Sequence, residues 1–340
     1  MTRLKLFLSL AALLLPALAC STLMGTASPQ PDSPNPPATQ EQPSEEIPAP
    51  QAAASCPLIT DQILALAVSD GEDVEENLLD EEIYIVTYSV SGDEITDPQN
   101  ESVSSDLQDE QDDEQTHQQV WEYFRSFIPA RERDGIAEYS IITDGRGGTL
   151  AAVSQTQSDP NLWSLQVDIA DTGNSYELTY TLVHEFGHLL TLGRRQVSPS
   201  LAVFNNPEDD DVYFEEASAC PDYFPGEGCA NPDSYIDDFY NQFWAGLYEE
   251  WNEINLEEDE DIYYEKLDEF YAKYEDRFVT SYAATNPEED IAEAFAFFVF
   301  SPEPAGDTIA VEKILFFYQY PELVELRANI LGNMCVSFPE

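Results

Sequence analysis

Two hydrophobic periodicities divide the chain beyond residue 56. Up to residue 170, apolar and polar residues alternate in short runs, which is the pattern of half-buried strands. These runs cover 83–90, 139–143, 149–155 and 162–170. From residue 177 onward, apolar residues recur every three or four positions, as on one face of a helix. The helical runs cover 177–192, 234–251, 261–278, 287–300 and 308–317.

The order of these elements predicts an α+β fold in which one domain, 57–340, has two lobes. A small mixed or antiparallel sheet and the helix that follows it occupy 57–192, and a mostly helical lobe occupies 193–340. Aromatic residues from Phe239 to Trp251 recur at helical spacing, so we expect them to pack in the core. Segments 91–119 and 194–232 are predicted to be loops or insertions.

The first 56 residues have a different composition. Arg3 and Lys5 precede an apolar stretch over 6–18, so residues 1–19 are predicted to be an export signal. Cys20 follows as in a bacterial lipoprotein, which leaves two alternatives, lipid attachment at Cys20 or cleavage alone. Residues 20–56, rich in Pro, Ser and Gln, are predicted to be a disordered tether. We therefore expect the protein on the outer face of a cell membrane as a lipoprotein, or secreted.

The remaining cysteines are even in number, as an oxidising compartment favours. They are Cys56, Cys220, Cys229 and Cys335. Four cysteines allow three pairings. We expect Cys220 to pair with Cys229 around a short loop, which leaves Cys56 to join Cys335.

The chain is strongly acidic, with 67 Asp and Glu against 13 Lys and Arg and a formal net charge of -54. This charge excludes nucleic acid as a natural partner. It leaves two interpretations, a heavily solvated surface or the attraction of basic peptides. The acidic run from Glu208 to Asp211 lacks EF-hand spacing, so it is either a solvated loop or a weak Ca²⁺ site.

The residues with the clearest chemistry are His184-Glu185-Phe186-Gly187-His188, inside a predicted helix. The chain has three histidines, and two of them stand here, four residues apart. This spacing places both imidazoles on one helix face, where they can bind one Zn²⁺, and Glu185 can activate a zinc-bound water. The motif predicts metal-assisted hydrolysis. The alternative is two histidines that merely pack on a helix, and a third ligand would decide between them.

The residues around the motif favour a helix with one unusual position. Asn174 and Glu177 resemble a capping pair, and Gly193 provides a stop. Gly187 lowers the helix propensity by about 1 kcal/mol relative to alanine. We therefore expect another backbone to pack closely against Gly187.

A second segment, 280–295, supplies candidates for the third ligand. Asn286 and Pro287 have the residue types that begin a helix. Glu289 and Glu293 then lie on one helix face, so one can bind the metal while the other accepts a hydrogen bond from a ligand histidine. The alternative for residues 288–290 is an acidic first turn that interacts with the helix dipole.

Together, the patterns H-E-F-G-H and T-S-Y-x-x-T-N-x-x-E-x-x-A-E-A-F resemble the glutamate-ligand zinc metallopeptidases, in particular the family of the anthrax lethal factor catalytic domain. The resemblance implies a zincin-like fold and one catalytic Zn²⁺ held by His184, His188 and Glu289. It also implies that Glu293 supports a ligand histidine, and that Glu185 and Tyr282 are catalytic. Residues 193–280 make the spacing longer than in that family, so they are interpreted as an insertion.

These observations predict a zinc-dependent endopeptidase that acts on peptide or protein substrates. In such enzymes an edge strand near the metal holds the substrate, and we assign this role to 162–170 or its neighbour. Two alternatives stay open. One is a surface binding or adhesion lipoprotein that keeps the fold without turnover, and the other is a zinc amidase that cleaves cell-wall crosslinks.

Overall fold

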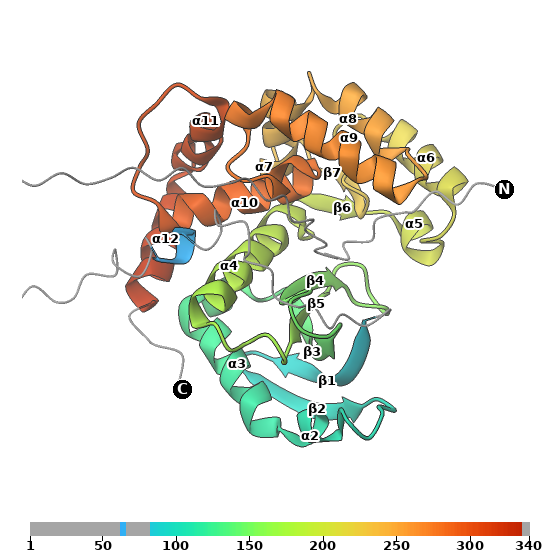
Figure 1. The fold of residues 1–340 in the computed structure, drawn as a ribbon, viewed down its shortest axis with the longest axis vertical. Coiled ribbons are helices and arrows are strands. Elements are labelled where there is room, and N and C mark those ends of the chain that lie inside the picture. Colours follow the sequence, from blue (N-terminus) through green and yellow to red (C-terminus); the bar gives the residue numbers. More distant parts are fainter. Residues whose placement is uncertain (1–61, 66–81, 335–340) are drawn as a thin grey trace, which may run out of the picture.

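The computed structural model describes residues 62–65 and 82–334, and its fold is α+β. Figure 1 shows the sheet and the first helices at one end of the molecule and the helices of the second half at the other. The predicted export signal, the tether, and Cys20, Cys56 and Cys335 lie outside the described residues. None of the helices in the described ranges is long and apolar enough to cross a membrane.

Five strands form one mixed sheet in the order β2-β1-β3-β5-β4. Their bounds are β1 Ile83–Ser91, β2 Glu94–Asn100, β3 Ile136–Thr143, β4 Ala151–Gln155 and β5 Trp163–Asp168. Strands β3 and β5 are parallel, and every other neighbouring pair is antiparallel. All four predicted strands are present, which confirms the strand periodicity.

The prediction that 162–170 is an edge strand is wrong, because β5 lies between β3 and β4. The alternation of apolar and polar residues in β5 suggested that one of its faces is exposed, but its polar residues are buried as well. Gln166 donates to Ser154 Oγ at 2.7 Å, and Ser164 Oγ lies 3.3 Å from Ser140 Oγ. The neighbouring strand β4 is the edge on this side of the sheet.

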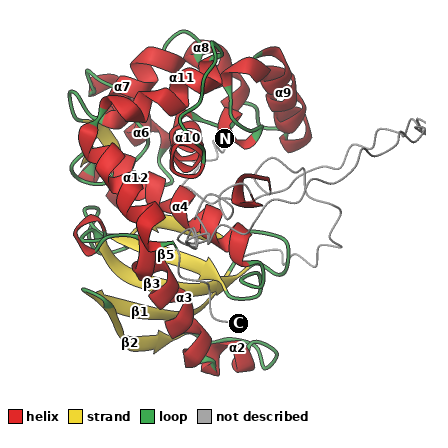
Figure 2. Ribbon diagram, turned by 90° about the vertical axis from the view of Figure 1, so that its left-hand side faces the viewer, coloured by secondary structure: helices red, strands yellow, loops and turns green. Residues whose placement is uncertain are grey.

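Residues 91–119 were predicted to be a loop or an insertion, and the loop alternative is wrong. This segment contains β2, α2 (Gln108–Asp112) and the start of α3 (Glu114–Phe127). Strand β2 is polar and mostly exposed, so it carries no hydrophobic alternation. Helix α3 lies against the sheet in Figure 2 and buries Val120, Trp121, Phe124 and Phe127, with the Trp121 and Tyr139 rings 5.5 Å apart.

Helix α4 (Ser175–Leu192) begins and ends where the sequence predicts. The Asn174 side chain accepts hydrogen bonds from the backbone N–H groups of Tyr176 and Glu177, and Gly193 is the C-cap. Helix α10 (Pro287–Phe300) is likewise as predicted, with Asn286 accepting from the Glu289 N–H and proline in the first turn.

The rest of the second half contains more elements than the sequence predicts. The region 194–232 is not only loop, because it folds into β6 (Val197–Pro199), α5 (Leu201–Asn205), α6 (Asp210–Ala219) and β7 (Gly228–Ala230). The run 234–251 is divided into α7 (Tyr235–Phe239), the π-helix η2 (Tyr240–Trp244) and α8 (Tyr248–Asn255). The remaining α-helices of this half are α9 (Glu260–Lys273), α11 (Ile309–Phe316) and α12 (Pro321–Asn333), and three short 3-10 helices lie between them, η3 (Glu275–Arg277), η4 (Tyr282–Ala284) and η5 (Phe317–Gln319). Helix α12 was not predicted.

The aromatic residues of 239–251 pack in the core, as predicted. Phe239 and Trp244 are fully buried, and Phe243 and Trp251 nearly so. Trp244 stacks on Phe270 of α9 with ring centroids 6.3 Å apart, and Phe239 contacts Phe316 of α11 at 5.4 Å. These rings join α7, η2, α8, α9 and α11 to the same core that holds α10.

Helices α4 and α10 pack against each other at Gly187, which confirms the expected close approach of a backbone. A Cβ atom built on Gly187 would lie 3.1 Å from Ala292 Cα and 3.4 Å from Ala292 O. Because both neighbours are small, the two helix backbones come close enough for side chains one turn away to meet. This contact sets the distance between the two predicted ligand-bearing helices.

Replacing Gly187 with valine should separate these helices. A branched side chain cannot fit against Ala292, so we expect Gly187→Val to lower the free energy of unfolding by about 1–3 kcal/mol, measured by urea denaturation. Gly332→Val is the matched control, because Gly332 also lies in a helix but has no neighbour within 4 Å of a built Cβ. Equal stability of the two variants would contradict the packing argument.

Candidate metal centre

Helix α4 presents His184, Glu185 and His188 together in a buried position. Each side chain is 5% exposed, and their ligand atoms lie within 4.8 Å of one another. His184 Nε2 and His188 Nε2 are 3.1 Å apart. Among the described residues, these three form the one cluster of His, Cys, Asp and Glu side chains whose ligand atoms lie close enough together to hold a metal ion.

Glu289 reaches the two histidines from α10. Its Oε2 lies 3.0 Å from His184 Nε2 and 3.3 Å from His188 Nε2. Ligand atoms about 2.0–2.1 Å from a tetrahedral ion stand roughly 3.3–3.4 Å apart, so the three atoms fit one small ion. The ligand atoms of His184, Glu185 and His188 lie within 4.8 Å of one another, and Glu289 Oε2 is closer than this to both histidine nitrogens. His184, His188 and Glu289 are therefore the residues best placed to hold a metal.

Glu293 lies behind His184 and fixes its orientation. Its Oε1 accepts from Tyr180 Oη at 2.8 Å and lies 2.9 Å from His184 Nδ1, and its Oε2 accepts from Thr280 Oγ1 at 2.5 Å. A carboxylate at Nδ1 keeps a proton on that nitrogen, which leaves the lone pair of Nε2 facing the cluster. The sequence reasoning missed Tyr180, although its position four residues before His184 on the same helix face is a usable signal.

The charges of this cluster shift one another. Burial raises the pKa of Glu185 to about 7, although the nearby His188 and His184 act in the opposite direction. Burial alone would lower the pKa of His184, but hydrogen bonds to Glu289 and Glu293 outweigh it and raise that pKa well above its usual value. The two carboxylates therefore concentrate negative charge around His184, which favours a cation at this position.

Tyr282 stands at the side of the cluster. Its ring centroid is 5.8 Å from that of His184, and burial together with the nearby Glu289 carboxylate raises the pKa of its hydroxyl well above the usual value. The short helix η4 that carries it is held by Thr280, whose Oγ1 accepts from the Ala283 N–H at 3.1 Å. Thr280 therefore connects the position of Tyr282 to that of Glu293.

The edge strand β4 passes close to the cluster. The backbone N–H of Val153, the middle residue of β4, faces the carboxylate of Glu185 and partly offsets the effect of burial on the pKa of that carboxyl group. Val153 is paired with Leu165 of β5 in the sheet. A backbone donor of the edge strand thus faces the same space as the histidines.

The third histidine has no part in this cluster. His117 is fully buried under the sheet, where its Nδ1 lies 2.8 Å from Tyr88 Oη and its Nε2 lies 2.9 Å from the carbonyl oxygen of Glu110. Both ring nitrogens therefore have partners, and His117 is a structural residue.

A disulfide joins Cys220 and Cys229, with Cα atoms 5.5 Å apart, which confirms the predicted pairing. The loop that it closes contacts α10 through a hydrogen bond, in which Tyr223 Oη donates to Glu288 Oε1 at 2.6 Å. The neighbouring acidic run forms the start of α6, and Asp209 accepts from the Val212 N–H as its N-cap. The described residues show no grouping at 208–211 that suits a metal ion.

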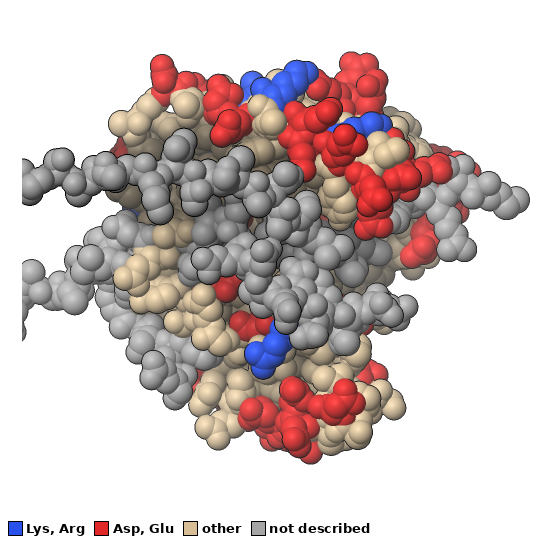
Figure 3. Space-filling view, in the orientation of Figure 1, with Lys and Arg blue, Asp and Glu red and all other residues tan. Residues whose placement is uncertain are grey.

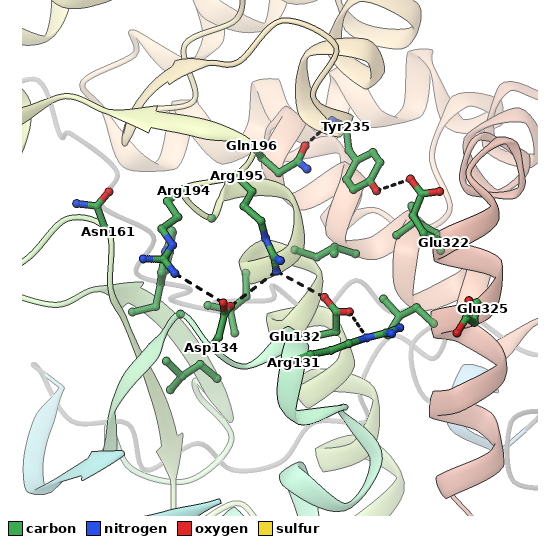
Figure 4. A pocket seen from close by; sticks show the side chains of 18 residues that line it. Arg131, Glu132, Asp134, Asn161, Arg194, Arg195, Gln196, Tyr235, Glu322 and Glu325 are labelled. Carbon is green, nitrogen blue, oxygen red and sulfur yellow. Dashed lines mark hydrogen bonds and ion pairs between the residues drawn. The ribbon is translucent and has the colours of Figure 1, made fainter. Parts of the chain in front are cut away.

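A separate cavity of about 470 Å³ opens at the C-terminal end of α4 (Figure 4). Its lining includes Leu189 and Gly193 of the α4 terminus, and Arg194 and Arg195 both point toward Asp134 at 3.6 and 3.7 Å. None of the residues of the histidine cluster lines this cavity. The histidine cluster and the cavity therefore lie at different places along α4.

No protein-family model, curated protein or solved structure matches the chain.

Removal of the disulfide should destabilise the fold. Replacing both Cys220 and Cys229 with serine opens a short loop in the unfolded chain, so we expect a loss of about 2–3 kcal/mol in the free energy of unfolding. Urea denaturation with and without reductant measures it. The wild type should lose at least this amount when reduced, whereas identical curves for the oxidised wild type and the double variant would show that the crosslink contributes nothing.

Proposed function

We propose that this protein is an exported zinc-dependent metalloendopeptidase. The observation that carries the proposal is the convergence of His184 Nε2, His188 Nε2 and Glu289 Oε2 within 3.0–3.3 Å of one another. Imidazole and carboxylate ligands in a closed triangle suit Zn²⁺ with one further position for water or substrate. Glu185, which binding alone would not require, stands beside the triangle.

The arrangement of elements supports a zincin-like fold in two lobes. A mixed sheet ends in the edge strand β4, helix α4 carries the histidines beside it, and α10 in the helical half carries the glutamates. The site thus lies where the two halves meet. The sequence resemblance to the lethal factor family leads to the same assignment of these residues.

The chain's own groups have distinct tasks in hydrolysis. A zinc ion, when bound, polarises the scissile carbonyl and lowers the pKa of a water toward about 7. Glu185 would accept the proton of the attacking water and deliver it to the leaving amine. The Tyr282 hydroxyl would donate a hydrogen bond to the developing oxyanion. Glu293 would hold His184 through Nδ1 during the reaction.

The edge strand suits an extended peptide as substrate. Among the described residues, strand β4 pairs with β5 alone, so an extended peptide could add to its outer side as a further strand. The Val153 N–H already faces Glu185, which would bring the substrate backbone next to the base. We therefore assign the binding of an extended substrate to β4, the neighbour of β5, because β5 lies inside the sheet.

The charge of the surface limits the choice of partners. In Figure 3, Asp and Glu side chains gather over both the helical end and the β2–α2 end of the visible face, with few Lys and Arg side chains among them. Such a surface repels nucleic acid and other polyanions. It is compatible with basic peptides as substrates and equally with a solvation role. A membrane anchor at Cys20 would place this surface outside the cell.

Two substitutions should separate metal binding from turnover. Glu289→Gln should lower zinc affinity more than about 100-fold, beyond the 10–100-fold typical of groups that only hydrogen-bond a ligand. Glu185→Gln should keep one zinc per molecule but lower kcat/KM for peptides at least about 100-fold. Zinc content by atomic spectroscopy and cleavage of a mixed peptide library measure the two effects.

Glu249→Gln, on the exposed face of α8, is the matched control and should change neither property. A wild-type protein that binds zinc but cleaves no peptide would instead favour the binding lipoprotein, and one that cleaves only cell-wall crosslinks would favour the amidase. A wild type without tightly bound metal would refute the proposed function.

Tyr282 should act on the transition state and not on substrate binding. We expect Tyr282→Phe to lower kcat about 100-fold to 1000-fold with little change in KM, because one oxyanion donor is lost. Steady-state kinetics on one peptide measure both constants. Tyr176→Phe, at an exposed position of α4, is the control. A rise in KM at constant kcat would instead assign Tyr282 to substrate binding.

A further inference from the structure

A buried ion pair lies on the far side of the helix that carries Glu289. Lys313 of α11 and Asp290 of α10 are both 0% exposed, and Lys313 Nζ lies 2.5 Å from Asp290 Oδ2. The same carboxylate oxygen accepts a hydrogen bond from Trp244 Nε1 at 2.7 Å. Asp290 is thus fixed from two elements, α11 and η2.

Aromatic rings surround the ammonium group. Lys313 Nζ lies 4.1 Å from the centroid of Phe278, and 5.9–6.0 Å from those of Phe239, Phe243 and Trp244. Ring faces attract a cation, but they do not replace the water that a lysine loses on burial. An apolar pair of similar volume would often be as stable as such an ion pair. Stability alone is therefore a weak reason for this pair.

The position of the pair points to another role. Asp290 directly follows Glu289 and lies three residues before Glu293, so the pair is held within one helical turn of both cluster glutamates. Phe278, which the ammonium contacts, is two residues before Thr280, the donor to Glu293 Oε2. Lys313 therefore contacts both segments that carry the cluster's supporting groups, α10 and the chain that leads to η4.

We infer that the Lys313–Asp290 pair is a positioning device for the proposed metal site. It fixes the rotation and the sliding of α10 from the side opposite α4, so that Glu289 and Glu293 stay aligned with the histidines. Neither residue touches the cluster's ligand atoms, so both act through α10. The inference rests on the proposed function, because it requires that the cluster bind a metal.

The test compares zinc affinity with the stability of the metal-free protein. Two variants are made in the full chain, Lys313→Met and the apolar pair Asp290→Leu with Lys313→Met. Competition with a chromogenic chelator gives the zinc affinity, and thermal unfolding of the metal-free protein gives the stability. We expect zinc affinity to fall about 10–100-fold in both variants, while the apolar pair keeps the wild-type melting temperature or exceeds it. The visible spectrum of the Co²⁺-loaded variants should also lose the intensity of a four-coordinate site.

The control is Lys273→Met, which removes an exposed lysine whose partner at 2.7 Å, Glu250, is exposed as well. It should bind zinc like the wild type. If the apolar pair does not fold, Asp290→Asn, which keeps the shape and an acceptor for Trp244, takes its place in the same comparison. Zinc affinity within about threefold of the wild type in these variants would overturn the positioning role while leaving the proposed function intact. A wild type that binds no zinc would overturn both.

Discussion

The contact between Gly187 and Ala292 is the constraint on which the site depends. The histidines are on α4 and the glutamates on α10, so no local geometry brings them together. A Cβ at position 187 would be 3.1 Å from Ala292 Cα, which is closer than most such contacts. Metal–ligand distances tolerate only about 0.2 Å of error, so a small separation of the two helices would be felt at the cluster. The glycine that weakens α4 as an isolated helix is what allows the three ligand atoms to converge.

In the first turn of α10, three successive acidic residues point in different directions and have different partners. Glu288 accepts from Tyr223, Glu289 faces the histidines, and Asp290 faces Lys313. Successive residues of a helix point about 100° apart, so three neighbours reach three different surroundings. An interaction with the helix dipole alone would leave such residues in solvent. Here each one has a specific partner, and the acidic turn connects the disulfide loop, the cluster and the buried lysine.

The sequence predicts the site better than it predicts the surroundings of the site. The caps at Asn174 and Asn286 and the need for a close backbone at Gly187 follow from local chemistry, and the structure shows all three. Strand periodicity also located four of the five strands in the sheet. Polar but buried residues such as Gln166 and Asp168 could not be recognised, because their hydrogen bonds depend on neighbours distant in the sequence. For the same reason β5 resembled an edge strand.

The elements that were missed have sequences whose burial depends on tertiary contacts. Strand β2 is polar because it is exposed at the sheet edge, and α6 has no buried residue, so neither shows a hydrophobic face. The run 234–251 has the periodicity of one helix, but a π-helix divides it and ends at Trp244, whose Nε1 donates a hydrogen bond to Asp290. Local helix propensity contains no information on this hydrogen bond, because Asp290 lies 46 residues further along the chain.

The placement of His117 has a practical consequence for spectroscopy. The chain has three histidines, and the one outside the cluster is buried with both ring nitrogens engaged. Burial lowers the pKa of His117, so its imidazole should stay neutral, and its resonances unshifted, through the pH range in which an ordinary histidine titrates, whereas the resonances of His184 and His188 report on the cluster. The protein thus contains its own internal reference, and a histidine-selective NMR spectrum of the unlabelled wild type reads one site without assignment by mutation.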